Sequence, residues 1–466
     1  MLSITEFIMS NAQFSSLPLS ADMLANLDSL NYKEMTPIQA QSLPIILQGQ
    51  DIIAKAKTGS GKTAAFGIGI LAQLNVKKFA IQSLVLCPTR ELADQVAKEI
   101  RRIARATHNV KVLTLCGGVS IGPQLGSLEH GAHIIVGTPG RIVDHIEKGS
   151  LKLENVKQLV LDEADRMLDM GFTDALKIVL AACPEERQTL LFSATYPDEI
   201  KKISAHCQKN PQEVSVESVH SDANIEQHFY ELRDGDRKNV AVQQLLAHFK
   251  PQSSIVFCNT KIQCQEVCDL LRAQRINALA LHGDLEQKER DQVLVRFSNK
   301  SCSVLIATDV AARGIDIKGL DAVINVELAH DSEVHVHRIG RTGRAGEKGL
   351  ALSLIAPNEL GRLNRLEDYL QKPLALEPLP QNDGVMDLKP EMVTLCIDGG
   401  KKEKVRAGDI IGALTKEAGL AFEKIGKIDI NDYSTYVAVH QSIAKQALQH
   451  LQDGKIKGRK FRARKL

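Results

Sequence analysis

The chain has 466 residues, enough for about three domains of roughly 150 residues, and its 44% hydrophobic content can give each a core. No apolar run of about 18 residues could span a bilayer, and the first residues lack the basic segment of a secretory signal, so we expect a globular cytoplasmic protein with no membrane partner. The nine cysteines form no CxxC pair with histidine partners, which argues against a zinc site and for reduced, buried thiols.

The net charge of +2 conceals an asymmetry along the chain. Residues 391–466 hold 15 Lys and Arg against 9 Asp and Glu, a local charge of +6, so the first 390 residues carry −4. A basic end on a mildly acidic body predicts a polyanion-binding module attached to a body with a different task.

Short runs rich in Val, Ile and Leu alternate with stretches of helical periodicity from residue 50 onward. Such runs predict strands that are buried on both faces, and hence parallel sheets covered by helices. In the first half of the chain the runs are 83–89, 133–139, 158–165 and 189–195. The rhythm restarts with 253–260, 278–284, 303–309, 322–328 and 349–356. We therefore expect an α/β protein with two doubly wound parallel-sheet domains in tandem.

Polar and proline-rich stretches mark the expected boundaries. The polar residues 215–224 predict a hinge, and the four prolines of KPLALEPLPQNDGVMDLKP (372–390) predict a semi-rigid linker. The remainder has the order β-α-β-β-α-β, which is typical of a small α+β sheet of the RRM type. We expect α/β domains at 1–210 and 218–372, a linker at 373–390 and an RRM-like domain at 391–466.

The segment DIIAKAKTGSGKT (51–63) has the order strand, glycine-rich loop and helix start, in which backbone N–H groups and the helix N-terminus bind phosphates. Glycines allow close approach of the backbone, Lys62 can reach the β- and γ-phosphates, and the Thr63 hydroxyl can ligate Mg²⁺. Ala56 stands where the first glycine is usual. We assign ATP with Mg²⁺ to this loop, with predicted contacts at Thr58, Gly59, Ser60, Gly61, Lys62 and Thr63.

Two further motifs complete a predicted hydrolytic site. The run QLVLDEAD places Asp162 and Glu163 at the end of a buried strand, where an acidic pair has no packing value. Asp162 is expected to hold Mg²⁺, and Glu163 to orient and deprotonate the attacking water. The second α/β domain has no second GK[ST] sequence, but in HRIGRTGR (337–344) Arg341 and Arg344 are suited to stabilise charge on the transferring phosphoryl group. Hydrolysis would then require closure of the two domains.

These motifs, with NYKEMTPIQ (31–39), PTREL (88–92), TPGR (138–141), SAT (193–195) and ATDVAARGID (307–316), stand in the order and spacing of DEAD-box RNA helicases. The chain resembles this family over residues 14–370. The resemblance implies two RecA-like domains and an RNA-stimulated ATPase with helicase activity.

The same resemblance implies roles for individual residues. Gln39 would read the adenine edge, and Tyr32, assisted by Phe14, would pack near the base. Gly314 and Asp316 would belong to the nucleotide site, with Asp316 at the ribose. Ser193 and Thr195 would link hydrolysis to domain movement. Contacts to the RNA backbone would come from Thr89, Arg90, Gly118, Thr138, Arg141, Arg290 and Thr308.

The C-terminal domain is the expected source of specificity. The architecture resembles the bacterial DbpA group of DEAD-box helicases, which implies recognition of 23S ribosomal RNA in precursors of the large ribosomal subunit. The third-strand segment contains Tyr433 and Tyr436 but lacks the usual RRM spacing of glycine and aromatic residues. We therefore expect RNA contacts from a basic loop and a basic tail, with a merely solvated tail as the alternative. The candidate residues are Lys401, Lys402, Lys404, Arg406, Arg459 and Lys460.

The sequence thus predicts a monomeric enzyme that locally unwinds short RNA duplexes. An ATP-gated RNA clamp, serving as an assembly platform without unwinding, would use the same residues and stays open as the alternative. A DNA translocase is disfavoured by the adenine-reading segment and the RRM-like domain.

Overall fold

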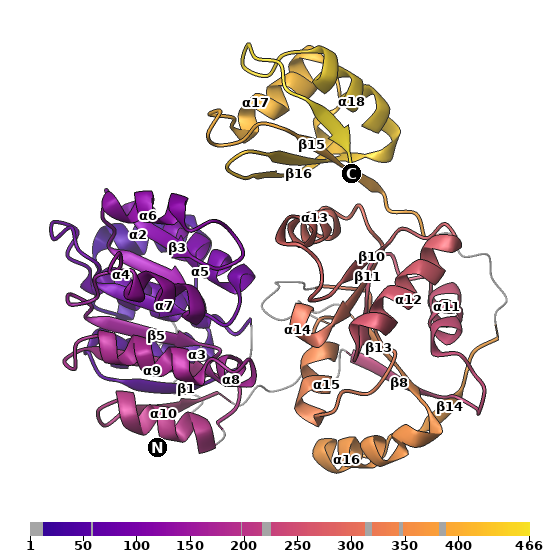
Figure 1. Ribbon diagram of the computed structural model, residues 1–466, viewed down its shortest axis with the longest axis horizontal. Coiled ribbons are helices and arrows are strands. Elements are labelled where there is room, and N and C mark those ends of the chain that lie inside the picture. Colours follow the sequence, from indigo (N-terminus) through magenta and orange to yellow (C-terminus); the bar gives the residue numbers. More distant parts are fainter. Residues whose placement is uncertain are drawn as a thin grey trace. The chain divides into compact units, whose positions relative to one another are not determined.

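The computed structural model describes residues 13–56, 59–196, 198–216, 225–312, 319–343, 348–381 and 388–466 (Figure 1). This part of the chain contains two seven-stranded sheets and one four-stranded sheet. The first α/β domain forms one unit, and the second α/β domain forms another unit together with the C-terminal domain. The expected fold class is therefore confirmed.

The first α/β domain is built on a wholly parallel sheet. Its strands are β1 (Ile52–Lys55), β2 (Ser83–Leu86), β3 (Val112–Leu115), β4 (Ile134–Gly137), β5 (Gln158–Asp162), β6 (Gln188–Ser193) and β7 (Gln212–Ser215). Alternate residues of each inner strand enter separate cores on the two faces, as Val85 and Leu86 of β2 do. Burial on both faces explains why these strands are continuous apolar runs.

Helices cover both faces of this sheet (Figure 1). One face is covered by η1 (Phe14–Ser16), α2 (Ala21–Ser29), α3 (Pro37–Leu47), α4 (Lys62–Gln73), α5 (Arg90–Ile103) and η2 (Ala104–Ala106). The other is covered by α7 (Pro139–Glu147), α8 (Ala164–Asp169), α9 (Thr173–Ala182) and α10 (Asp198–Cys207), while α6 (Gly122–Glu129) lies between β3 and β4 in the chain.

The second α/β domain repeats this design. Its strands are β8 (Ile225–Glu231), β9 (Ser254–Cys258), β10 (Ala278–Leu281), β11 (Val304–Thr308), β12 (Ala322–Asn325), β13 (Gly349–Ile355) and β14 (Leu376–Pro378), all parallel. Its helices are α11 (Lys238–Phe249), α12 (Lys261–Ala273), α13 (Gln287–Ser298), α14 (Asp309–Ala312), α15 (Ser332–Ile339), η4 (Pro357–Glu359) and α16 (Leu360–Leu370).

Both seven-stranded sheets have the same strand order. The first reads β3-β4-β2-β5-β6-β1-β7 and the second β10-β11-β9-β12-β13-β8-β14, so the strands of each domain, numbered along the chain, occupy equivalent places. The last strand, β14, lies in the stretch that the sequence presents as a linker. It pairs with β8 at the edge of the sheet. Proline has no N–H to donate to a neighbouring strand, so a residue such as Pro378 is tolerated on an edge strand.

The C-terminal domain is an antiparallel sheet in the order β16-β17-β15-β18. Its elements are β15 (Met392–Ile397), α17 (Ala407–Gly412), a π-helical turn (Ala413–Glu417), η6 (Phe422–Lys424), β16 (Ile425–Ile430), β17 (Thr435–His440), η7 (Gln441–Ile443), α18 (Ala444–Asp453) and β18 (Ala463–Lys465). Side chains of α17 and α18 share one core with alternate residues of β15 and β17, so both helices lie on one face of the sheet. The predicted order β-α-β-β-α-β is confirmed.

Across these described ranges no helix is long and apolar enough to cross a membrane.

Candidate nucleotide and RNA sites

The glycine-rich loop joins β1 to α4, at the carboxyl end of the sheet. Gly61 precedes α4 with a φ of 100°, and a Cβ there would lie 2.6 Å from the Gln39 side chain, so only glycine fits without displacement. Gly59 also has positive φ, at 86°. The amide of Ala56 donates to the Ser193 carbonyl (3.0 Å), which ties the start of the loop to β6. Thr58 lies outside the described residues.

Gln39 holds this loop against α3. Its side chain is 1% exposed; Oε1 accepts from the Thr36 N–H (2.9 Å), and Nε2 donates to the Gly61 carbonyl (3.0 Å). The side chain therefore already has a protein partner at each end, and its expected contact with adenine stays a prediction. The structure adds that Gln39 links α3 to the phosphate loop.

Lys62 and Asp162 face each other in the interior. The Lys62 Nζ lies 3.9 Å from Asp162 Oδ1, and both side chains are buried. Among the residues that the structure describes, neither of these two atoms has a hydrogen-bond partner. Burial raises the pKa of Asp162 to about 6, although Lys62 acts in the opposite direction. Buried polar groups without partners cost free energy, so this pair fits a ligand that brings anionic oxygens to the lysine and a cation to the carboxylate.

Glu163 and Asp165 flank the start of α8. Glu163 has left-handed backbone angles (φ 51°, ψ 52°), which residues other than glycine and asparagine seldom adopt. Asp165 Oδ2 accepts from the N–H of Ala194 (3.2 Å) and from the N–H and hydroxyl of Thr195 (both 3.0 Å). The Asp165 N–H donates to the Ser193 hydroxyl (3.3 Å). The expected coupling residues are thus fastened to the acidic motif.

The two expected base-packing aromatics contact each other. The rings of Phe14 and Tyr32 meet edge to face with centroids 6.1 Å apart. The Tyr32 hydroxyl donates to Glu99 and accepts from Arg102 (2.8 Å), and burial, followed by Glu99, raises the pKa of Tyr32 to about 12. Tyr32 is therefore held against α5 as a neutral phenol.

The expected RNA contacts of the first α/β domain lie just past the carboxyl ends of three neighbouring strands. Thr89 follows β2, Gly118 follows β3 and Thr138 follows β4. Thr89 and Thr138 are the N-cap residues of α5 and α7, and Gly118 has a φ of 70°. The nucleotide-loop and acidic residues follow β1 and β5, so the strand order places the two sets on different halves of one sheet edge.

Two arginines in this group have unsatisfied N–H groups. Arg90 has buried Nε and Nη1 atoms that find no hydrogen-bond partner among the described residues. Arg141 is held by Asp144 (3.1 Å) and the Val119 carbonyl (2.9 Å), and no described residue bonds to its buried Nη1. Unsatisfied guanidinium donors suit an anionic backbone, and Arg141 is bonded to Val119, the residue after Gly118.

Sequence analysis assigns no role to Arg338 of HRIGRTGR, but the structure gives this side chain several partners in the second α/β domain. Its guanidinium is buried and forms a two-bonded pair with Asp309 (2.7 and 2.6 Å). It also donates to the Glu327 carbonyl and to Asn259 Oδ1, each at 2.7 Å. Arg338 therefore fixes α15 against the strand ends and has no donor to spare for a ligand.

The predicted catalytic arginines, Arg341 and Arg344, follow Arg338 in the sequence. Arg341 follows Gly340, the C-cap residue of α15, and its carbonyl accepts from the Leu320 N–H (3.3 Å). Arg344, Gly314 and Asp316 lie outside the described residues. Of the expected RNA contacts, Thr308 ends β11, and Arg290 on α13 donates to the Ala311 carbonyl (2.6 Å).

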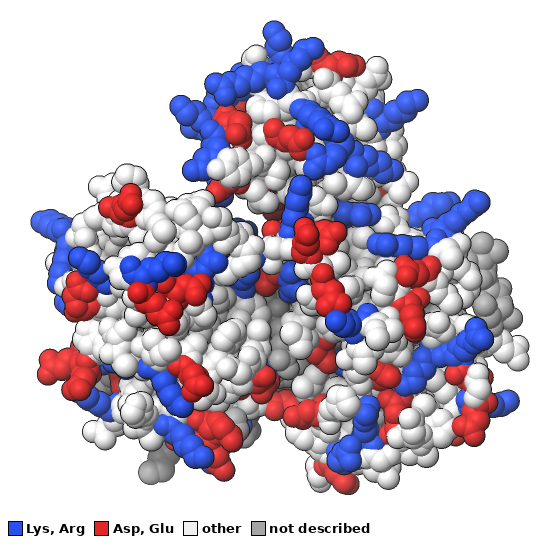
Figure 2. All heavy atoms as spheres, in the orientation of Figure 1, with Lys and Arg blue, Asp and Glu red and all other residues white. Residues whose placement is uncertain are grey.

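The basic segments of the C-terminal domain meet at one end of its sheet, and Lys and Arg gather over this domain in Figure 2. The loop after β15 is bonded to the loop before β17, with the N–H groups of Lys401 and Lys402 donating to the carbonyls of Asn431 and Asp432 (both 2.9 Å). Lys457 Nζ reaches the Lys404 carbonyl (3.5 Å), which joins the tail to the same loop. Arg406, Arg459 and Lys460 belong to these two segments.

A parallel-sheet ATP loop with an acidic strand end, a repeated α/β domain and a basic RRM-like domain together define an RNA-dependent motor. The family model of the DEAD/DEAH box helicase matches residues 36–203, that of the helicase conserved C-terminal domain matches 237–346, and that of the DbpA RNA binding domain matches 394–465. The chain belongs to the DEAD-box family of ATP-dependent RNA helicases.

Within this family, the chain is similar to proteins of the DbpA group. The chain is 55% identical over 454 residues to the ATP-dependent RNA helicase DbpA of Escherichia coli K12, covering 97% of this chain and 99% of that protein. It is 36% identical over 477 residues to the DbpA of Bacillus subtilis 168, with the same coverage. The structure of Saccharomyces cerevisiae Dbp5 bound to RNA and ADP BeF₃ matches with a TM-score of 0.70 at 30% identity, covering 79% of this chain and 96% of that one. The expected family and RNA partner are thus confirmed.

Proposed function

We propose that this helicase locally separates short RNA duplexes and is directed by its C-terminal domain to 23S ribosomal RNA in precursors of the large ribosomal subunit. The proposal for the motor rests on the buried Lys62–Asp162 pair, whose facing atoms have no hydrogen-bond partner within the described part of the chain. The proposal for targeting rests on the basic segments that meet at one end of the C-terminal sheet and on the similarity to DbpA proteins. As an RNA-processing monomer it would act in the cytoplasm.

The nucleotide would be held by the loop between β1 and α4. Backbone N–H groups from Thr58 to Gly61 and the Lys62 ammonium would bind the phosphates. Mg²⁺ would enter with the nucleotide, held by Thr63 and Asp162, and would supply charge neutralisation between phosphate groups. The described residues hold no group of three or more His, Cys, Asp or Glu that could bind a metal ion.

The remaining roles follow from position. Glu163 would hold the attacking water, and Arg341 with Arg344 would stabilise charge on the transferring phosphoryl group. Gln39 and Tyr32 with Phe14 would select adenine, and Asp316 with Gly314 the ribose. Backbone contacts at Thr89, Arg90, Gly118, Thr138, Arg141, Arg290 and Thr308 would grip one RNA strand without reading its bases.

The motor assignment is tested with Lys62→Ala against Lys98→Ala. Lys98 is an exposed lysine of the same domain, 2.7 Å from Asp94 on α5, so its removal changes the charge equally. RNA-stimulated ATP hydrolysis should be lost in Lys62→Ala and kept in Lys98→Ala. A normal RNA-stimulated rate in Lys62→Ala would refute the site.

The targeting assignment is tested with two triple alanine variants of equal charge. One replaces Lys401, Lys402 and Lys404; the control replaces Lys416, Lys424 and Lys445, elsewhere in the same domain. ATPase stimulation by a 23S ribosomal RNA fragment and by an unrelated RNA is compared. The first variant should lose the preference for the 23S fragment, keep its basal rate and show a weaker salt dependence of binding. An unchanged preference contradicts the assignment.

Release of a labelled strand from a hairpin-bearing duplex distinguishes unwinding from clamping. ATP-dependent release supports unwinding. ATP hydrolysis without any released strand would favour the RNA clamp.

A further inference from the structure

The second α/β domain has a lysine at the place that Lys62 holds in the first. Strands β1 and β8 occupy the same position in their sheets, and each is followed by a helix, α4 or α11, that begins with a lysine. Lys238, the first residue of α11, is therefore the positional counterpart of Lys62. The residue before it is Arg237, where the first domain has Gly61. The fold thus repeats this lysine but not the glycine that precedes it.

Lys238 is neutralised by two carboxylates of its own domain. Its Nζ donates to Glu327 Oε1 (3.3 Å) and to Glu359 Oε2 (2.8 Å). Glu327 lies two residues beyond β12, the counterpart of β5, which ends at Asp162. Lys62 faces that single carboxylate at 3.9 Å, whereas Lys238 is bonded to two. Because two carboxylates repel phosphate groups, the second domain fills with its own side chains the place where the first is proposed to bind a triphosphate.

Burial makes this Lys238 centre, formed by Lys238, Glu327 and Glu359, costly to disturb. Glu359 is 3% exposed, and its Oε2 also accepts from the Ala356 N–H (3.2 Å). Its Oε1 lies 3.6 Å from Arg362 Nη1 on α16. Removing one partner of a buried ion pair leaves a charge that is not compensated. Loss of the Lys238 ammonium would therefore drive the two carboxylates apart.

Glu327 connects the Lys238 centre to the segment that carries Arg341. Its Oε2 accepts from the Asn259 N–H (3.3 Å), and its carbonyl accepts from Arg338 Nη1 (2.7 Å). Asn259 Oδ1 accepts from the same guanidinium (2.7 Å). The Arg341 N–H in turn donates to the Arg338 carbonyl (3.1 Å). A shift of Glu327 would therefore move Arg338 and, with it, the backbone of Arg341.

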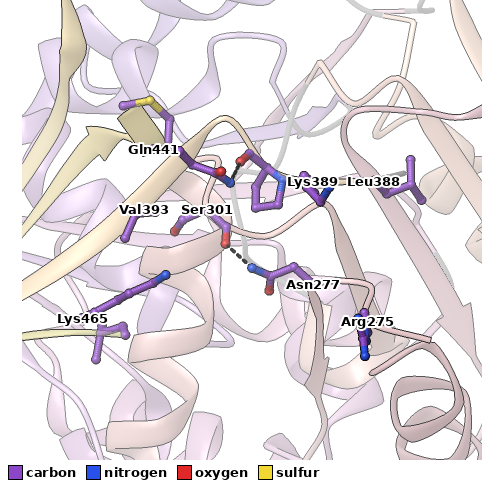
Figure 3. A pocket seen from close by; sticks show the side chains of 11 residues that line it. Arg275, Asn277, Ser301, Leu388, Lys389, Val393, Gln441 and Lys465 are labelled. Carbon is purple, nitrogen blue, oxygen red and sulfur yellow. Dashed lines mark hydrogen bonds between the residues drawn. The ribbon is translucent and has the colours of Figure 1, made fainter. Parts of the chain in front are cut away.

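The pocket in Figure 3 lies at the opposite edge of this sheet. It has a volume of about 210 Å³, and its residues Asn277 and Ser301 precede β10 and β11. Asn259 and Glu327 follow β9 and β12, so the Lys238 centre lies at the carboxyl ends of the same parallel strands. Open parallel sheets bind their ligands at the carboxyl ends of the strands, so the Lys238 centre, and not this pocket, lies at the functional edge.

We propose that Lys238 is a positioning residue for ATP hydrolysis, which acts through Glu327 and Asn259 on the segment that presents Arg341. The Lys238 ammonium is bonded within its own domain, and its effect on the reaction is carried by the placement of Arg341. The inference deepens the proposed function and rests on the catalytic role proposed for Arg341. It gives the lysine of the second domain a task that requires no nucleotide in that domain.

The first test compares Lys238→Met, which removes the ammonium, with Lys238→Arg, which keeps a cation. RNA-stimulated hydrolysis is measured as a single turnover of radiolabelled ATP with enzyme in excess, so that slow variants are detected. Lys238→Met should be slower by roughly tenfold or more, because a misplaced catalytic group loses rate steeply. Lys238→Arg should recover most of this loss. Lys250→Met, at an exposed position just past the other end of α11, is the matched control and should hydrolyse ATP normally.

Affinity for a fluorescent ADP analogue without RNA is measured on the same variants. It should be unchanged in Lys238→Met, because the proposed nucleotide loop belongs to the first α/β domain. A parallel loss of ADP affinity and rate would show that Lys238 does not act through the arginine segment, and would overturn the inference.

A double-mutant cycle with Arg341→Ala separates positioning from a general folding defect. If Lys238 acts through Arg341, Lys238→Met should lower the rate of Arg341→Ala by less than about twofold, because the group to be positioned is already absent. Glu327→Gln, a smaller change at the same contact, should give the same pattern. A further loss as large as in the unmodified background would overturn the inference, whether it came from a folding defect or from a separate role.

The failure of the inference is distinguishable from the failure of the proposed function. An unchanged rate in Lys238→Met, with a slow Arg341→Ala, overturns the positioning role and leaves the proposed catalytic arginine intact. An unchanged rate in Arg341→Ala alone refutes the catalytic arginine and, with it, the inference that rests on it.

Discussion

Protonation of Asp162 should limit nucleotide binding in mild acid. Burial raises the pKa of this carboxyl to about 6 in the free protein, and Mg²⁺ with its phosphates requires the ionised form. At a pKa of about 6, roughly 90% of the carboxyl is ionised at pH 7 and roughly 9% at pH 5. The raised pKa therefore predicts that affinity falls as the pH decreases, by about tenfold or 1.4 kcal/mol over this interval.

The assay is equilibrium titration with a fluorescent, non-hydrolysable ATP analogue and excess Mg²⁺ at several pH values across this range. The phosphates of the analogue titrate in the same interval, so the same series is measured on Asp162→Asn, which cannot ionise. The ratio of the two dissociation constants isolates Asp162 and should change about tenfold. If both proteins lose affinity in parallel, Asp162 is already ionised throughout and the inference from its burial is wrong.

Three further substitutions test separate parts of the molecule. Thr195→Val removes one of the three hydrogen bonds that Asp165 Oδ2 accepts from residues 194 and 195, worth about 1.5–3 kcal/mol. It should reduce strand release more than ATP hydrolysis when both are measured together, and equal losses would exclude a coupling role. Arg338→Lys should lower the free energy of unfolding by about 3–5 kcal/mol, because lysine cannot form the two parallel hydrogen bonds to Asp309 in the interior. An unchanged unfolding midpoint in urea would contradict this prediction. Gly400→Ala should lower the thermal midpoint of the C-terminal domain, because the added Cβ would lie 2.2 Å from a carbonyl oxygen. Gly408→Ala should leave the midpoint unchanged, because its Cβ would have no neighbour within 4 Å. Equal midpoints of the two variants would show that the loop shifts to accommodate the methyl group.

Strands that are buried on both faces could be predicted from sequence, including β10 at a sheet edge, but partly exposed strands such as β8 could not. Strands β2, β4, β5 and β6 are buried on both faces, so each is a continuous apolar run that stands out from its surroundings. The edge strands β3, β7 and β14 are short and partly exposed, and they carry no such run. Pro378 even reads as a loop signal, because only its place at an edge makes it compatible with a strand.

The site divides in a similar way. Gly61, Lys62 and Asp162 are recognisable because phosphate and metal chemistry requires these residue types within a short segment. Asp165 and Arg338 have partners that are remote in the chain: Asp165 bonds to residues 194 and 195, and Arg338 to Asn259 and Asp309. No local pattern encodes such pairings, so their roles emerge only from tertiary structure.

The left-handed backbone of Glu163 has a practical consequence for protein engineering. A glutamate in this conformation costs about 1–2 kcal/mol compared with glycine, which has no Cβ to collide with its own carbonyl. Selection of variants for heat resistance alone should therefore favour glycine at this position, and the survivors would lack the carboxylate proposed to act on water. In this enzyme the most heat-stable variants from such a selection would not be the most active ones.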